Sequence, residues 1–340
     1  MCRQIFTNCK IGGTQRERKK EPNDSSSSGC PQVKRIEHGS TFRNKQNTSS
    51  DVVCQQSFFF IVFNYCPLPG VWIAFTSYNF RDGIFGSPFV GLSNFEFLIS
   101  SGELWTLTKN TILYNLVFIL LGNVFQIVIA LMLNEIRSKF FKKVSQTIMF
   151  LPYFISAVLI GAIAFNILNY DTGALNALLR ETGADPIQIY SKAGLWPFII
   201  IFCNMWQQTG YGSVVYFAAI CGIDSSMVEA AEVDGATSWQ RIRYIILPSL
   251  KGTFIILLLF ALGGIMKGNF GLFWNLTGGA NSQLFPTTDI IETFVYRTMT
   301  TQNNFATSSA VGLYQSIFGF VLVMFSNWVV KRLDPDYALF

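Results

Sequence analysis

The chain has 340 residues, of which 50% are apolar or aromatic and only 13% are charged, about half the usual share. A soluble protein this poor in charge could not cover its surface, so the composition predicts an all-α protein embedded in a membrane. It excludes collagen, a disulfide scaffold and wholesale disorder.

The sequence gives little support for chemistry carried out by the chain itself. His38 is the single histidine, and no two of the seven cysteines form a C-x-x-C pair. A metal site, a disulfide framework and catalysis by several histidines are therefore not expected. No lysine follows a glycine, so the phosphate-loop pattern that binds ATP cannot occur. We expect no catalytic residue, no metal and no cofactor.

The first 51 residues are polar and irregular, and they carry ten of the 25 Lys and Arg residues. The first apolar run begins too late for a signal peptide. This composition is typical of a disordered segment. We predict a solvated, basic cytosolic tail at residues 1–51 and a membrane domain at residues 52–340; contact of the tail with anionic lipid or nucleic acid is the alternative.

Six windows approach the ~20 apolar residues that a bilayer span requires. They are residues 57–76, 111–133, 147–168, 196–220, 251–268 and 309–330. The second is the clearest, with fifteen Leu, Ile, Val and Phe residues. Prolines interrupt the first at Pro67 and Pro69, and two glycines break the fifth at Gly263 and Gly264. The windows predict about six transmembrane helices.

The positive charges between the windows predict the orientation. With the N-terminus inside, the inner side holds 19 of the 25 Lys and Arg residues, and it still holds 9 against 6 when the tail is left out. Cytoplasmic loops of membrane proteins carry the excess of these residues. Both termini and the loop at residues 222–248 are therefore expected in the cytoplasm.

That loop contains the signals of two short helices. Ser226 with Glu229 has the spacing of a capping box, and so does Thr237 with Gln240. Gly235 lies where the first helix must end. Pro248 restricts Leu247 and marks the turn into the fifth span. The loop is either a linker hairpin on the membrane surface or a rigid docking element that a soluble partner pushes.

A motif inside the loop reads Glu-Ala-Ala, three residues, Gly, nine residues, then Ile-x-Leu-Pro. Its members are Glu229, Ala230, Ala231, Gly235, Ile245, Leu247 and Pro248. The pattern is similar to the EAA signature of binding-protein-dependent ABC importer permeases. Further segments resemble the carbohydrate branch of that family, particularly the polysaccharide and aldouronate type. They are residues 65–75, 86–95, 133–135, 151–156 and 289–297.

The resemblance covers residues 65–340 and implies a type I ABC importer permease fold. It implies that the chain is a non-enzymatic permease subunit of an ATP-driven sugar or oligosaccharide importer, located in the bacterial cytoplasmic membrane. The implied partners are a second, homologous permease, a cytoplasmic ABC ATPase dimer and an extracellular sugar-binding protein. The implied ATPase-coupling residues are Glu229, Ala230, Ala231, Asp234, Gly235, Trp239, Ile245, Leu247 and Pro248.

Polar side chains inside spans are costly, so they indicate either a substrate pathway or contacts between helices. In the fourth span they share one helical face, and further groups lie in the second and sixth spans. The candidates are Asn204, Gln207, Gln208, Tyr211, Asn123, Gln126, Tyr314 and Gln315. For each group both interpretations stay open.

Two other functions compete with the importer. A secondary transporter or channel would need ionisable residues within its spans, and the second to fourth and sixth windows have essentially none. A membrane scaffold would use the loop to bind a protein other than an ATPase. The sequence does not identify the sugar.

Overall fold

The computed structural model describes residues 55–66, 68–279 and 281–333. Its regular elements are helices, and within the described residues the β pairing is one isolated antiparallel bridge between Thr76 and Phe89. This confirms the all-α prediction. The chain divides into two compact units, residues 1–62 and 63–340, and the contacts below lie within the second. The predicted tail at residues 1–51 falls outside the described residues.

Three helical segments are each long and apolar enough to cross a membrane: Gln55–Phe75, α4 (Glu103–Glu135) and α16 (Phe305–Leu333). Three bent pairs raise the number to as many as six if each pair forms one span. The pairs are built around α5 (Lys139–Phe150) with α6 (Ala157–Leu168), α8 (Trp196–Cys221) with α9 (Ser225–Val233), and α11 (Leu247–Ser249) with α12 (Lys251–Gly263). The six predicted windows fall on these segments.

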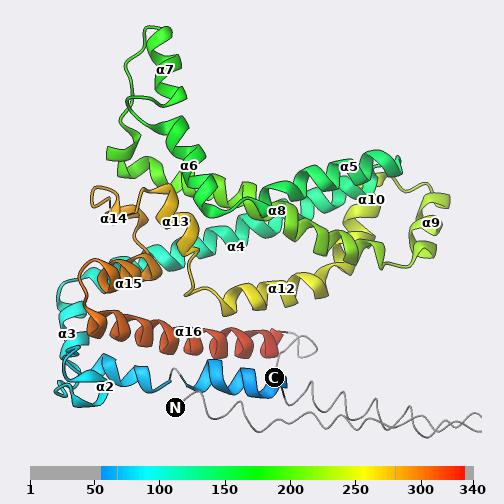
Figure 1. Ribbon diagram of the computed structural model, residues 1–340. Coiled ribbons are helices and arrows are strands. Elements are labelled where there is room, and N and C mark those ends of the chain that lie inside the picture. Colours follow the sequence, from blue (N-terminus) through cyan, green and yellow to red (C-terminus); the bar gives the residue numbers. More distant parts are fainter. Residues whose placement is uncertain (1–54, 67, 280, 334–340) are drawn as a thin grey trace, which may run out of the picture. The chain divides into compact units, whose positions relative to one another are not determined.

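Shorter helices connect them. They are η1 (Leu68–Phe75), α2 (Gly83–Gly86), α3 (Ser93–Ser100), η2 (Leu151–Phe154), α7 (Ala174–Glu181), η3 (Ile189–Ser191), η4 (Ala193–Leu195), α13 (Phe270–Leu276), α14 (Phe285–Thr288) and α15 (Ile291–Thr300). Within the second unit, α4 and α8 run side by side, and α16 packs against η1 and α15 (Figure 1). A glycine turn follows α13, where Gly278 and Gly279 both have positive φ.

The third window, residues 147–168, does not form one straight helix, because the chain bends by 90° between Phe154 and Ala157. Pro152 lies at the start of η2 and has no N–H to continue a helix. The Ser156 hydroxyl then accepts a hydrogen bond from the Leu159 N–H at 3.4 Å and caps α6. The proline and the new cap together divide the window into two helices.

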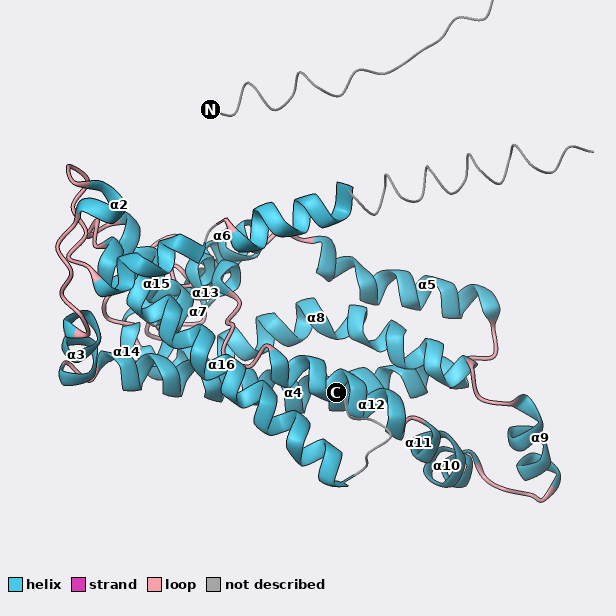
Figure 2. Cartoon of the chain, turned by 90° about the horizontal axis from the view of Figure 1, so that it is seen from below, coloured by secondary structure: helices cyan, strands magenta, loops and turns pink. Residues whose placement is uncertain are grey.

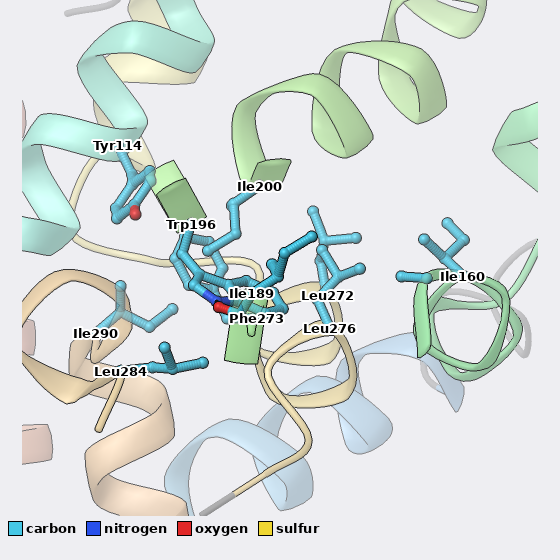
Figure 3. Close-up of a cluster of buried hydrophobic side chains, with 11 residues drawn as sticks. Tyr114, Ile160, Ile189, Trp196, Ile200, Leu272, Phe273, Leu276, Leu284 and Ile290 are labelled. Carbon is cyan, nitrogen blue, oxygen red and sulfur yellow. The ribbon is translucent and has the colours of Figure 1, made fainter. Parts of the chain in front are cut away.

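A buried cluster joins α4, α8, α13 and the segments around η3 and α14. Its largest member is Trp196, which is fully buried and donates its indole N–H to the Ile189 carbonyl at 3.0 Å. Figure 3 shows Trp196 beside Ile189, with Phe273, Leu284 and Ile290 around it. The hydrogen bond satisfies the one polar atom of this large side chain, so Trp196 can be fully buried and holds the η3 segment against α8.

Small residues allow the helices to approach closely. A Cβ built on Gly161 of α6 would lie 2.5 Å from the backbone oxygen of Asn275 in α13. A Cβ on Gly210 of α8 would meet the Met149 carbonyl, and one on Gly212 would meet the Gln126 amide. Close backbone approach at small residues is the usual means of packing helices in membranes.

We expect Gly161→Ala to destabilise the protein by about 1–3 kcal/mol, because the added methyl group forces α6 and α13 apart. Thermal unfolding in detergent measures the effect. Gly312→Ala in α16 is the matched control, since a Cβ there meets no atom within 4 Å. Equal melting temperatures for the two variants would contradict close packing at Gly161.

Candidate coupling loop and substrate pathway

The first loop helix, α9, begins at Asp224. The Asp224 carboxylate accepts a hydrogen bond from the Ser226 backbone N–H at 3.0 Å. That bond, together with one from the Ser226 side chain, lowers the pKa of Asp224. The predicted capping box at Ser226 and Glu229 is therefore wrong. Asp224 lies two residues earlier and its side chain reaches a free N–H of the first turn.

Gly235 ends α9 as predicted. Its φ of +78° is in the left-handed region, where a Cβ is unfavourable. The Gly235 N–H donates to the Glu232 carbonyl at 3.1 Å, and the Ala236 N–H donates to the Ala231 carbonyl at 2.9 Å. These two bonds satisfy the last carbonyls of the helix and define one tight turn.

The second loop helix, α10 (Ser238–Arg241), has the predicted capping box. The Gln240 backbone N–H donates to the Thr237 hydroxyl at 3.3 Å, while the Thr237 N–H donates to the Gln240 side chain at 2.8 Å. An ion pair between Arg241 and Glu232 then joins α10 to α9 across the turn. The opposite charges of the two helices were the only sign of it in the sequence.

The loop continues through a π-helix, η5 (Ile242–Ile246), into α11. The expected restriction of Leu247 by Pro248 is wrong, because Leu247 is helical with φ −59° and ψ −44°. A π turn shifts the hydrogen-bonding pattern by one residue, so a proline without an N–H fits into the helix. The bend of 54° falls after it, between Ser249 and Lys251.

One side of the loop packs against the long helices α4 and α8. Ile246 and Leu250 are buried in one cluster with Ala130 of α4 and with Tyr216 and Ile220 of α8. A displacement of the loop must therefore displace α4 and α8 as well.

The opposite side of the loop is exposed to solvent. Glu229, Ala230 and Asp234 are exposed, and so are two large apolar side chains, Trp239 at 65% and Val233 at 88%. A hollow of about 370 Å³ lies beside the turn, lined in part by Ala231, Asp234, Gly235 and Ile245. Leu247 and Pro248 are also exposed. Figure 2 shows α9, α10 and α11 together at one end of α8.

The candidate pathway residues of the second and fourth spans meet at one cavity. Its volume is about 310 Å³, and its wall includes residues of α4, α8 and α12. The predicted residues in the wall are Asn123, Gln126, Asn204, Gln208 and Tyr211. Two groups that were separate in the sequence are therefore one site.

Some polar residues of this region hydrogen-bond to the protein, and others have no such bond. Within the part of the chain that the structure describes, the amides of Gln126, Asn204 and Gln208 form no hydrogen bond with the protein. Asn123 accepts from the Tyr216 hydroxyl and donates to the Ile119 carbonyl at 2.7 Å. Gln207 lies outside the cavity wall and donates to the Ile155 carbonyl at 3.0 Å.

Tyr211 supplies an aromatic surface at the edge of the cavity. Its ring stacks on Tyr153 with a centroid distance of 4.4 Å and an angle of 11° between the planes, and it remains 46% exposed. The pair is a flat, apolar wall beside three free amides.

The candidates of the sixth span lie elsewhere. Tyr314 shares a hydrogen bond of 3.1 Å with the Thr108 hydroxyl. Gln315 donates to the Met266 carbonyl at 2.6 Å and to Glu292 at 2.7 Å. Neither residue lines the cavity at Tyr211, and both hold helices together.

Comparison with known proteins gives the family. The family model described as "Binding-protein-dependent transport system inner membrane component" matches residues 120–338. The chain belongs to this family. Both the loop motif and the cavity lie almost wholly inside the matched region.

Individual relatives are similar to this chain over most of its length. Protein LplB and the polygalacturonan/rhamnogalacturonan transport system permease YteP, both of Bacillus subtilis (strain 168), are each 31% identical over 82% of this chain and 86% of their own length. A bacterial ABC transporter involved in import of the acidic polysaccharide alginate matches in structure with a TM-score of 0.76. It is 30% identical and covers 86% of this chain and 97% of its own. The chain is thus a permease component of an inner-membrane transport system that depends on a binding protein.

The adjacent glutamines Gln207 and Gln208 are expected to behave differently. Gln207→Leu should destabilise the permease by about 1 kcal/mol, because the Ile155 carbonyl loses its donor. Gln208→Leu should leave the melting temperature unchanged and reduce transport, because it removes a free amide from the cavity. Thermal unfolding and uptake should be measured on both variants. A Gln208→Leu variant that lost stability and kept full transport would show that Gln208 holds the fold together rather than binding substrate.

Proposed function

We propose that the chain is one of two permease subunits of an ATP-driven importer of sugars or oligosaccharides. The observation that carries the proposal is the cavity, where three unpartnered amides lie beside a stacked tyrosine pair. Amides bond to hydroxyl groups, and an aromatic face packs against the apolar face of a sugar ring. The relatives named above, which include a polygalacturonan/rhamnogalacturonan permease and an importer of the polysaccharide alginate, support the same substrate class.

We infer that a separate ATPase pair supplies the energy and binds the open side of the loop. The sequence contains no phosphate loop. Glu229, Ala230 and Trp239 are all exposed on the loop, so a groove on the ATPase could take both the charge and the apolar surface. A second permease would complete the pathway, and an external binding protein would deliver the sugar.

The anchoring of the loop supplies a route from the ATPase to the cavity. Tyr216 lies in the buried cluster with Ile246 and Leu250, and its hydroxyl donates to Asn123 in the cavity wall. A push on α9 and α10 therefore reaches α4 and α8, the two helices that hold the free amides. Closure of the ATPase pair would thus turn the pathway from inward-facing to outward-facing.

Reconstitution tests the function as a whole. We expect an ATPase to copurify with the permease, and sugar uptake by proteoliposomes to require ATP and the binding protein. Calorimetry on the copurifying binding protein identifies the sugar to be used. Uptake without ATP would indicate a secondary transporter, and binding of a non-ATPase protein without any uptake would indicate a scaffold.

We expect Gly235→Val to abolish coupling, because a β-branched side chain at a left-handed position costs roughly 1 kcal/mol or more and distorts the turn. Glu229→Lys should abolish it too and reduce recovery of the ATPase, since it removes the charge proposed to contact the ATPase, and losing one partner of a buried hydrogen-bonded charge pair costs about 2–5 kcal/mol. Sugar-stimulated ATP hydrolysis and pull-down measure both effects.

Residues 181–183, at the end of α7, provide matched controls. Gly183→Val carries the same strain at φ +76°, and Glu181→Lys reverses an exposed charge on α7. Both should retain sugar-stimulated hydrolysis. Normal transport by Gly235→Val and Glu229→Lys would make the loop a passive linker.

We further propose that both termini and the loop face the cytoplasm. In a cysteine-free background, cysteines in place of Ser226 and Ser282 should react with an impermeant maleimide from opposite sides of intact cells. Ser282 is exposed between α13 and α14, on the predicted outer side. Labelling of both positions from outside would rule out this orientation.

A further inference from the structure

The chain leaves regular helix between α12 and α13, at residues 264–269. Ile265 and Met266 are buried in a cluster with Leu107 of α4 and Val311 of α16. Backbone groups that leave a helix inside a membrane protein need partners from the protein itself. The partners of this segment therefore show what holds it in place.

Side chains from three helices bind four consecutive residues of the break. Asn115 of α4 donates to the carbonyls of Ile265 and Lys267 at 3.0 and 3.1 Å. Gln315 of α16 donates to the Met266 carbonyl at 2.6 Å. Glu292 of α15 accepts from the Gly268 N–H at 2.6 Å. We call these three side chains, Asn115, Glu292 and Gln315, the hinge clamp.

The clamp is itself connected and closely fitted. Gln315 also donates to the same Glu292 oxygen at 2.7 Å, which joins α16 to α15. A Cβ built on Gly268 would clash with Cδ1 of Ile290 and lie 2.7 Å from the second Glu292 oxygen, so these side chains must shift to admit it. The clamp therefore depends on the exact position of the backbone at Gly268.

One atom of the clamp has no partner. Among the described residues, the second carboxylate oxygen of Glu292 is buried without a hydrogen bond. A buried polar atom in this condition is costly, and here it belongs to the carboxylate that also binds the Gly268 N–H and Gln315. A small shift of the backbone at Gly268 would change which donors face the carboxylate.

We propose that Glu292, held by Gln315, is a positioning residue that couples movement of α12 to the outer helices α13 and α15. The proposal rests on the proposed function. α12 follows the loop helices directly, after the bend at Leu250, and ends at the clamp. The clamp bonds the segment to α4, α15 and α16, and α13 beyond it packs against α6 and α15. A displacement of α12 by the ATPase thus reaches the outer helices through four backbone residues.

Hydrogen exchange on the assembled transporter in lipid nanodiscs tests this coupling, with ATP and vanadate as the trapping probe. In the wild type, trapping should change exchange both in the loop at residues 222–250 and in the outer segment at residues 270–300. In Glu292→Ala the loop should still respond and the outer segment should not. Exchange at residues 264–270 should become about tenfold faster, because the Gly268 N–H and Gln315 both lose their acceptor.

Further variants separate the clamp from a loss of folding. Glu292→Gln keeps an acceptor oxygen for Gly268 and Gln315, so it should restore most of the outer response. Gly268→Ala should also weaken the outer response, because its methyl group would displace the Glu292 carboxylate and the Ile290 side chain beside it. Thr298→Val is the matched control on the same helix, because the Thr298 hydroxyl is the other buried side-chain atom of the described residues without a partner. It should leave both responses normal.

The outcomes are distinct. An outer response that persists in Glu292→Ala and Gly268→Ala would overturn the clamp, and so would a loss in Glu292→Gln as complete as in Glu292→Ala. A loss in Thr298→Val would do the same, by showing that any change on α15 has this effect. A wild-type loop that does not respond to ATP and vanadate would overturn the proposed ATPase docking and the clamp with it.

Discussion

Backbone groups that leave a helix inside a membrane bundle must bond to the protein, and this constraint determines where the polar side chains of this permease lie. The chain leaves regular helix between α5 and α6 and again between α12 and α13. Gln207 supplies the donor at the first break, and Asn115 and Gln315 supply donors at the second. Each of these amides would be costly if it faced lipid. The breaks and the amides are therefore stable only together.

The same constraint explains why some polar residues remain available. Asn204 and Gln208 lie in unbroken helix, where the backbone already satisfies itself. Gln126 lies against Gly212, whose lack of a side chain leaves space for the amide. These three amides therefore have no structural task in the described residues, and the cavity between α4 and α8 is where they meet.

Sequence reasoning could find the membrane fold and the shape of the loop, because both depend on local signals. The length of an apolar run predicts a span. Gly235 and the Thr237–Gln240 pair end or begin helices only a few residues away, so their effect can be recognised from the local sequence. It could not divide the polar residues of the spans, since Gln207 and Gln208 differ only in what the rest of the fold brings beside them. The errors at Ser226 and Leu247 have a different origin, because in both a neighbouring local feature competed with the predicted one. A competing cap at Asp224 and a π turn before Pro248 changed the outcome locally. The role of Glu292 had no local signal, because its partners lie at Gly268 and Gln315.

The cavity wall has an evolutionary consequence. Apart from one tyrosine, none of the side chains that line it can ionise, so the proposed sugar site offers amides and apolar surface rather than a fixed charge. An uncharged lining of this kind neither traps an anionic sugar nor repels a neutral one. A lineage could therefore change its cargo by altering the soluble protein that captures it, while the permease kept the same amides. Divergence among such transporters would then be fast outside the membrane and slow within it.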